Sequence, residues 1–174
     1  MFKKAFLISA SLVFAFGILV TSVLRTSAQT AVNEESQVLA AKTKVEYYLP
    51  YPGILPDHFL YPIKMIRDKI LLFLTTEPLK RAQRLLHYAD KMVEAARILV
   101  EGGKPELGVS TATKAEKYLE QAIAQERIAN EKGKDTNTLL ERLSKATLKH
   151  EEVLLEMSEK VTGSEKQTII DLVR

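Results

Sequence analysis

Apolar residues recur every three or four positions through most of the chain after residue 60, which is the period of an amphipathic helix. The pattern predicts a first helix that begins near Tyr61 or Pro62, because proline is tolerated in the first helical turn. The last turn of this helix, residues 70–74, is apolar on all sides, so we expect other parts of the protein to cover it. Its apolar face holds Ile63, Ile66, Ile70 and either Phe73 or Leu74.

The second predicted helix has the most regular pattern. Thr76 is suited to cap its N-terminus, and Gly102 with Gly103 marks its end. Its apolar positions alternate in steps of three and four, as in a helix that packs along another helix. These positions are Leu79, Ala82, Leu86, Ala89, Val93, Ala96 and Val100.

A third helix is predicted within residues 105–132, and Gly133 ends it. Gly108 weakens its first turns, since glycine has a low helix propensity. Small residues dominate its apolar row and allow a neighbouring backbone to come close. This row consists of Ala112, Ala115, Leu119 and Ala122.

A fourth helix follows a cap at Asp135 or Thr136 and ends at Gly163. Ser164 and Gln167 have the spacing of a capping box for a last short helix over residues 165–173. The apolar row of the fourth helix consists of Leu139, Leu143, Ala146, His150, Val153 and Met157.

The three long helices have about 25 residues each, or about 37 Å at the helical rise per residue. Short links between them make consecutive helices antiparallel neighbours. We therefore expect an all-α fold, an antiparallel bundle of three long helices plus a shorter N-terminal helix. A signal or anchor helix and an extended arm rich in proline and tyrosine precede this bundle in the chain.

The N-terminus has the pattern of an export signal. Lys3 and Lys4 precede twenty uncharged, mostly apolar residues at 5–24, and small residues up to Ala28 suit cleavage by a signal peptidase. Twenty apolar residues are also long enough to remain as a membrane-spanning helix. Both readings predict export to the outer face of the cytoplasmic membrane, the cell envelope or the medium, and an uncleaved helix makes the membrane a partner.

The charge balance changes once this segment is set aside. The chain has a net charge of +3, but Lys3, Lys4 and Arg25 lie before Ala28. Without these three of its 25 basic residues the chain has 22, equal to its 22 acidic residues. A neutral, well-mixed domain offers no overall electrostatic footprint for nucleic acid or for anionic lipid, so we expect no nucleic-acid binding. The chain has no cysteine, which excludes disulfides and thiolate metal sites.

The expected domain organisation has four parts. A signal peptide or anchor at 1–28 is followed by a flexible tether at 29–46, an extended arm at 47–57 and the helical bundle at 58–174. The arm either docks into a partner protein, with Tyr47, Tyr48, Tyr51 and Ile54 as contacts, or lies across the bundle as a strap. We favour the strap, which would cover the apolar end of the first helix.

Two histidines are candidate metal ligands. His87 and Asp90 are three residues apart on one helical face, but flanking cations favour a solvated histidine. His150 lies in an apolar row and is expected to be a core residue with one hydrogen-bond partner. A di-metal bundle requires Glu-x-x-His pairs from two helices, but Thr147 stands three residues before His150 and the sequence has no such pair. We expect no metal, no cofactor and no catalytic residue.

The carboxylate pairs Glu116–Glu120 and Glu151–Glu152 are expected to be solvated surface, since each lies among other charged residues. No catalytic or phosphate-binding motif is present. The leading hypothesis is a non-enzymatic exported domain that serves as a structural or protein-interaction module of the envelope, with an unknown envelope protein as partner. The alternative is an extracytoplasmic sensor or chaperone that binds a small ligand, metal or unfolded chain, with His87 and His150 as its first candidates.

Four short motifs lie within residues 55–99. They are Leu55, Pro56 and Asp57, then Leu60, Tyr61, Pro62 and Lys64, then Pro78, Leu79 and Lys80, and finally Ala89, Asp90 and Lys91. With these motifs the segment resembles a bacterial family of exported helical domains, the domain of unknown function DUF5667. Met65 stands where members often have a second basic residue after Lys64. The resemblance implies an envelope-associated all-helical domain and assigns no catalytic residue.

Overall fold

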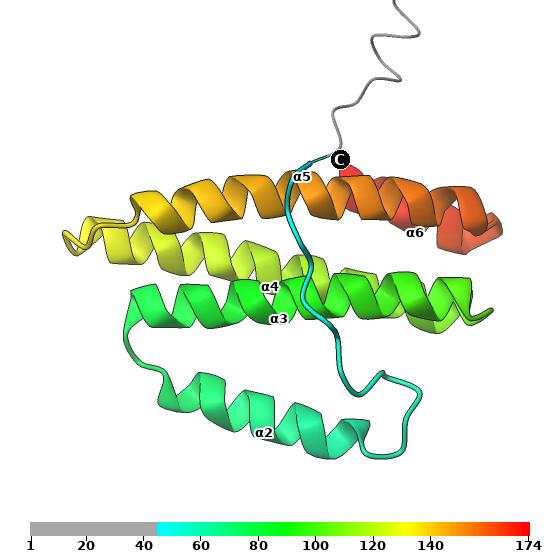
Figure 1. The fold of residues 1–174 in the computed structure, drawn as a ribbon, viewed down its shortest axis with the longest axis horizontal. Coiled ribbons are helices and arrows are strands. Elements are labelled where there is room, and N and C mark those ends of the chain that lie inside the picture. Colours follow the sequence, from blue (N-terminus) through cyan, green and yellow to red (C-terminus); the bar gives the residue numbers. More distant parts are fainter. Residues whose placement is uncertain (1–44) are drawn as a thin grey trace, which may run out of the picture. The chain divides into compact units, whose positions relative to one another are not determined.

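A computed structural model describes residues 45–174, so the predicted signal segment and nearly all of the predicted tether lie outside the described residues. Within the described part the chain is all-helical and contains no strand, as predicted. No helix in that part is both long and apolar enough to cross a membrane. The helices are α2 (Tyr61–Leu74), α3 (Pro78–Glu101), α4 (Pro105–Glu131), α5 (Asn137–Lys160) and α6 (Gly163–Val173) (Figure 1).

The long helices α3, α4 and α5 run side by side, and consecutive ones are antiparallel (Figure 1). In the same view α3 lies between α2 and α5, and α6 folds back along the bundle. The apolar rows predicted for α4 and α5 are buried throughout. The row predicted for α3 is also buried, except that Leu79 at its start is only partly buried. The periodicity of these three helices therefore identified the core correctly.

Close contact between α3 and α4 depends on a glycine. A Cβ atom at Gly108 would lie 2.6 Å from Cγ2 of Val100 and 2.9 Å from the backbone oxygen of Ala96. Real Cβ atoms do not approach other atoms this closely, so α3 leaves no room for a side chain at position 108. Gly108 weakens the helix locally, but it allows the two backbones to approach.

The ends predicted for α3 and α4 are confirmed, whereas α5 ends at Lys160, before the predicted Gly163, and two predicted caps are wrong. The chain turns at Gly103 and Gly133, both with φ near +75°, a conformation that glycine adopts without strain. At the start of α3 the capping position is Glu77 instead of Thr76, and no side chain caps the helix. The last helix starts at Gly163, and the hydroxyl of Ser164 donates to the Glu165 carboxylate instead of capping the helix.

The proline-rich arm crosses α5 and α3 in Figure 1. The backbone N–H of Val45 donates to Oε2 of Glu152 in α5 at 3.2 Å. Leu49 packs on the core, and Pro52 is fully buried. Nζ of Lys64 in α2 donates to the carbonyls of Pro52 and Ile54, both at 3.1 Å. These contacts agree with the strap interpretation.

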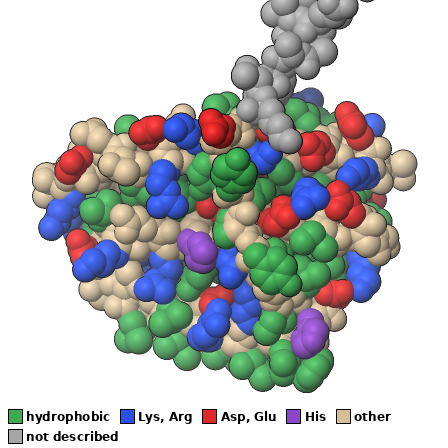
Figure 2. All heavy atoms as spheres, in the orientation of Figure 1, with side chains coloured by type: hydrophobic (Ala, Val, Ile, Leu, Met, Phe, Trp, Pro, Cys, Tyr) green, Lys and Arg blue, Asp and Glu red, His purple; other side chains and the backbone are tan. Residues whose placement is uncertain are grey.

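The prediction for the apolar face of α2 is wrong. Its five predicted core residues are between 53 % and 80 % exposed, and the arm does not cover them. The buried residue of α2 is Asp68. The helix therefore turns a mixed face toward the bundle, with Asp68 and Lys64 beside Leu72, which packs on the core, and it turns its most apolar face outward. Figure 2 shows the resulting hydrophobic side chains gathered along the edge formed by α2.

Candidate functional site

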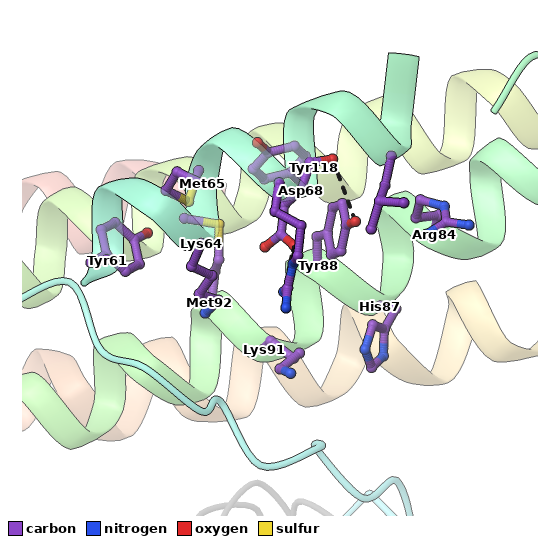
Figure 3. Close-up of a pocket in the computed structure, with 12 residues that line it drawn as sticks. Tyr61, Lys64, Met65, Asp68, Arg84, His87, Tyr88, Lys91, Met92 and Tyr118 are labelled. Carbon is purple, nitrogen blue, oxygen red and sulfur yellow. Dashed lines mark hydrogen bonds and ion pairs between the residues drawn. The ribbon is translucent and has the colours of Figure 1, made fainter. Parts of the chain in front are cut away.

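A pocket of about 210 Å³ lies between α2 and α3, and one side chain of α4 closes it (Figure 3). On α2 the lining residues include Tyr61, Lys64, Asp68 and Leu71, whose spacing of three and four places them on one helical face. This is the face opposite the exposed apolar residues. The pocket therefore exists because α2 directs its polar side toward α3.

Aromatic and sulfur-containing side chains form the walls of the pocket. The rings of Tyr88 in α3 and Tyr118 in α4 meet edge to face, with centroids 6.1 Å apart. The Tyr88 hydroxyl donates a long, 3.5 Å hydrogen bond to the backbone oxygen of Asp68, which is the dashed line in Figure 3. Tyr61, Met65 and Met92 complete this apolar part of the lining.

Positive charge dominates the polar part of the lining. Lys64, Arg67, Arg84 and Lys91 contribute four cations, and Asp68 is the only carboxylate among the lining residues. Arg67 donates from Nε and Nη2 to Oδ1 of Asp68, at 3.0 Å and 2.7 Å. One carboxylate cannot neutralise four cations, so the pocket has an excess of positive charge.

Burial and the neighbouring cations act on the titration of two groups at this pocket. Burial and the nearby Lys91 ammonium both lower the pKa of Lys64. The pKa of His87 is lowered by partial burial and again by Lys91. Nε of Arg84 is buried and has no hydrogen-bond partner. A buried donor without a partner costs about 1–3 kcal/mol, so the placement of Arg84 in the pocket wall is unfavourable for stability.

A second polar cluster lies inside the bundle and links four elements. The hydroxyl of Tyr47 in the arm donates to Oδ2 of Asp90 in α3 at 2.7 Å. Oδ1 of Asp90 lies 3.2 Å from Nε2 of His150 in α5. Nδ1 of His150 lies 2.8 Å from Oε1 of Glu116 in α4. We call Tyr47, Asp90, His150 and Glu116 the buried network.

Burial sets the electrostatics of this network. Burial alone would lower the pKa of His150, but its hydrogen bonds to Asp90 and Glu116 outweigh burial and raise it. The pKa of Tyr47 is raised, first by burial and then by its hydrogen bond to Asp90. The His150 side chain is only 1 % exposed, so solvent and solutes do not reach the ring. The network is therefore suited to holding the elements together.

The four predicted contact residues of the arm do not form one surface. Tyr47 points inward to Asp90, whereas Tyr48 and Tyr51 are 89 % and 81 % exposed. Ile54 is exposed to a smaller extent. The prolines set the extended course of the arm, but the sequence did not show which tyrosine enters the bundle.

His87 agrees with expectation, whereas His150 differs in the number of its partners. His87 is exposed at the edge of the pocket, and the carboxylate of Asp90 is engaged by Tyr47 and His150. His150 is a core residue as predicted, but it has two partners instead of one. No group of three or more His, Asp or Glu side chains within residues 45–174 is placed to hold a metal ion.

Two carboxylates expected at the solvated surface have structural partners instead. Glu116 is partly buried against His150, whereas Glu120 is exposed. Glu152 is also partly buried and accepts hydrogen bonds from Val45 and Lys149. The sequence contains no local signal for these pairings, because the partners are at least 34 residues away in two of the three cases.

The comparison with known proteins agrees with the resemblance noted from the motifs. No curated protein and no solved structure matches the chain. The pattern that defines one family matches residues 53–164, which include the pocket and almost all of the bundle. The chain therefore belongs to the family described as Domain of unknown function (DUF5667).

Proposed function

We propose that this protein is a non-enzymatic, exported domain that rests on an anionic membrane surface through the outer face of α2. The observation that carries the proposal is the inverted orientation of this helix, which buries Asp68 and exposes its large apolar residues. We define the α2 face as Ile63, Ile66, Ile70, Phe73 and Leu74.

The size of the α2 face argues for an interaction. Burying one large apolar side chain contributes about 1.5–3 kcal/mol, and five adjacent ones remain in contact with water here. Contiguous apolar patches of this kind mark sites of interaction with proteins or membranes. The outer face of α2 is therefore the strongest candidate for contact with a partner.

The charges around the α2 face favour a lipid surface. Arg67 and Lys69 are exposed beside the apolar residues, and the only acidic residue of α2, Asp68, is turned inward. Helices that lie in a membrane interface combine an apolar face with basic residues in this way. A second copy of α2 would oppose these cations with cations and offer no exposed acid to pair with them.

The N-terminal sequence supports the same location. The uncharged residues 5–24 would hold the chain at a membrane if they are not cleaved, and residues 25–44 are long enough to act as a tether. Stable attachment to membranes commonly needs two separate signals. The α2 face would supply the second one and set how the domain lies on the surface.

The buried network supports a non-enzymatic role. It contains a histidine between two carboxylates, which resembles an acid–base arrangement, but Asp90 and His150 are buried from solvent. A catalytic group must come within hydrogen-bond reach of its substrate. The enclosure of these two residues therefore favours a structural function for the network.

A single tryptophan tests the proposal, since the chain contains none. In the full chain carrying Phe73→Trp, we expect a blue shift of tryptophan fluorescence with anionic vesicles and a smaller shift with neutral ones. Leu140→Trp, at an exposed position on α5, is the matched control and should not shift. Adding Arg67→Gln and Lys69→Gln to the Phe73→Trp chain should abolish the difference between the two vesicles.

The same experiment separates the alternatives. Equal spectra for Phe73→Trp with and without anionic vesicles would contradict the proposal. A blue shift that appears without lipid and grows with protein concentration would assign the α2 face to a second copy of the chain instead.

A further inference from the structure

We propose that the pocket between α2 and α3 binds a small organic anion that has an aromatic body and one carboxylate or phosphate group. The site lies on the inner side of α2, so it is separate from the α2 face. Three features of the lining define the ligand. They are the positive charge of the lining, the unsatisfied donor of Arg84 and the aromatic walls of the pocket.

The charge of the lining requires an anion. The ammonium groups of Lys64 and Lys91 and the guanidinium of Arg84 line the same cavity, and the one carboxylate, Asp68, is already bonded to Arg67. A concave site with one sign of charge attracts the opposite charge, and partly enclosed walls strengthen the interaction. Burial is the main cause of the lowered pKa values of Lys64 and His87, and the nearby Lys91 ammonium adds to it.

The donor geometry selects the kind of anion. Arg84 lines the pocket, and its buried Nε lacks a partner. A guanidinium group presents parallel N–H donors that match the two oxygens of a carboxylate or phosphate. Such a group would pair with the Arg84 guanidinium in the pocket wall.

The walls and the size of the pocket select the rest of the ligand. Tyr61, Tyr88 and Tyr118 provide aromatic surfaces, and rings pack well against them edge to face or offset. The volume of about 210 Å³ is below the range of about 300–1,000 Å³ that is typical of sites for drug-sized ligands. The ligand is therefore small, of the order of one ring with its acidic group.

The proposal can be tested with benzoate and phenyl phosphate as probes. We would follow the His87 ring signals by NMR in the full chain, held in a neutral detergent without lipid, so that the result does not depend on membrane binding. Benzoate should shift these signals in a saturable way and raise the pKa of His87, because a nearby negative charge favours the protonated ring. The other charged groups that act on this ring are Asp68, Asp90, Lys91 and Arg142.

Neutral and ring-free compounds serve as controls for the ligand. Benzamide has the shape of benzoate without its charge, and acetate has the charge without the ring. Both should bind much more weakly than benzoate. The exposed His58, outside the pocket, is an internal reference whose signals should not change.

Variants of Arg84 test the assigned residue. Arg84→Gln should weaken benzoate binding by about tenfold or more, because a charge-assisted hydrogen bond contributes at least that much. Arg84→Lys, which retains the charge but lacks Nε, should have an intermediate affinity. Arg127→Gln removes an exposed arginine of α4 that does not line the pocket, and it should bind as the unaltered chain does. Circular dichroism would confirm that each variant is folded.

Three results would overturn the proposal. They are an absence of saturable binding for both probes, equal binding of benzamide and benzoate, and equal affinity of the folded Arg84→Gln and Arg127→Gln chains. None of them would affect the membrane proposal, which is measured at the outer face of α2.

Discussion

Asp90 of α3 and His150 of α5 are 60 residues apart in the chain, yet their side chains meet at 3.2 Å inside the bundle. Each residue also has a second partner, Tyr47 of the arm for Asp90 and Glu116 of α4 for His150. This pair therefore joins the arm to all three long helices. Its energetics can be tested separately from the function of the pocket and of the α2 face.

The pH dependence of stability should report on His150. The folded state raises the pKa of this ring above its ordinary value of 6.5, because the carboxylates outweigh the effect of burial. Its stabilising contribution is therefore complete below pH 6.5 and is lost as the pH rises through the folded pKa. We expect the free energy of unfolding, from urea titrations, to fall over this range, and His150→Gln should reduce the fall.

His87 would partly mask this effect. Because its pKa is lowered in the folded state, its contribution to the free energy of unfolding is lost as the pH falls, whereas that of His150 is lost as the pH rises. The comparison should therefore be made between the chain with His87→Gln alone and the chain with both His87→Gln and His150→Gln. An unchanged pH profile after His150→Gln in this background would show that the ring is not protonated in the folded protein.

The tyrosines of the arm provide a matched pair. Tyr47→Phe removes the hydroxyl that donates to Asp90, and we expect a loss of about 1–3 kcal/mol in the free energy of unfolding because a buried carboxylate oxygen loses its partner. Tyr48→Phe makes the same chemical change at an exposed position and should have no measurable effect. Urea denaturation measures both. Equal stability of the two variants would refute the strap interpretation.

Gly108 should not tolerate a methyl group. Gly108→Ala would improve helix propensity, but its Cβ would lie 2.9 Å from the Ala96 carbonyl oxygen, so α3 and α4 would have to separate. We expect thermal denaturation to show a net destabilisation of about 1–3 kcal/mol, as in other overpacked cores. Ser110→Ala, at an exposed position on α4, is the control and should be neutral or slightly stabilising. A stabilised Gly108→Ala protein would contradict the close approach of the two helices.

Truncation of apolar residues should distinguish the α2 face from the core. Ile66→Ala, on the exposed face, should change the free energy of unfolding by less than about 0.5 kcal/mol in lipid-free solution. Leu86→Ala, at a fully buried position of α3, should cost about 2–5 kcal/mol. Comparable losses in the two variants would mean that the α2 face is covered in solution.

Much of the architecture was predictable because it depends on local spacing. Residues of α3, α4 and α5 that recur every three or four positions lie on one face of each helix, and long helices of this kind bury that face against each other. Gly103 and Gly133 ended two of the helices as predicted, since glycine adopts a positive φ without strain. The resemblance in residues 55–99 also identified the family correctly.

The candidate site was not predictable in the same way. Ile63, Ile66 and Ile70 share one face of α2, and the sequence determined that much. Whether this face points into the bundle or out of it depends on what α3 and the arm present to the other side of the helix. That side carries Lys64, which donates a hydrogen bond to an arm carbonyl. It also carries Asp68, whose carboxylate accepts a hydrogen bond from Arg67.

The sequence by itself thus determined the helices, their ends and the residues that share a face. Only the tertiary structure decided the orientation of α2, the pocket beneath it and the pairing of Asp90 with His150 and Glu116. The physical reason is the range of the interactions. Helix formation and amphipathic patterns depend on neighbours within about four residues, whereas the pocket and the buried network join side chains that become neighbours only when the helices pack.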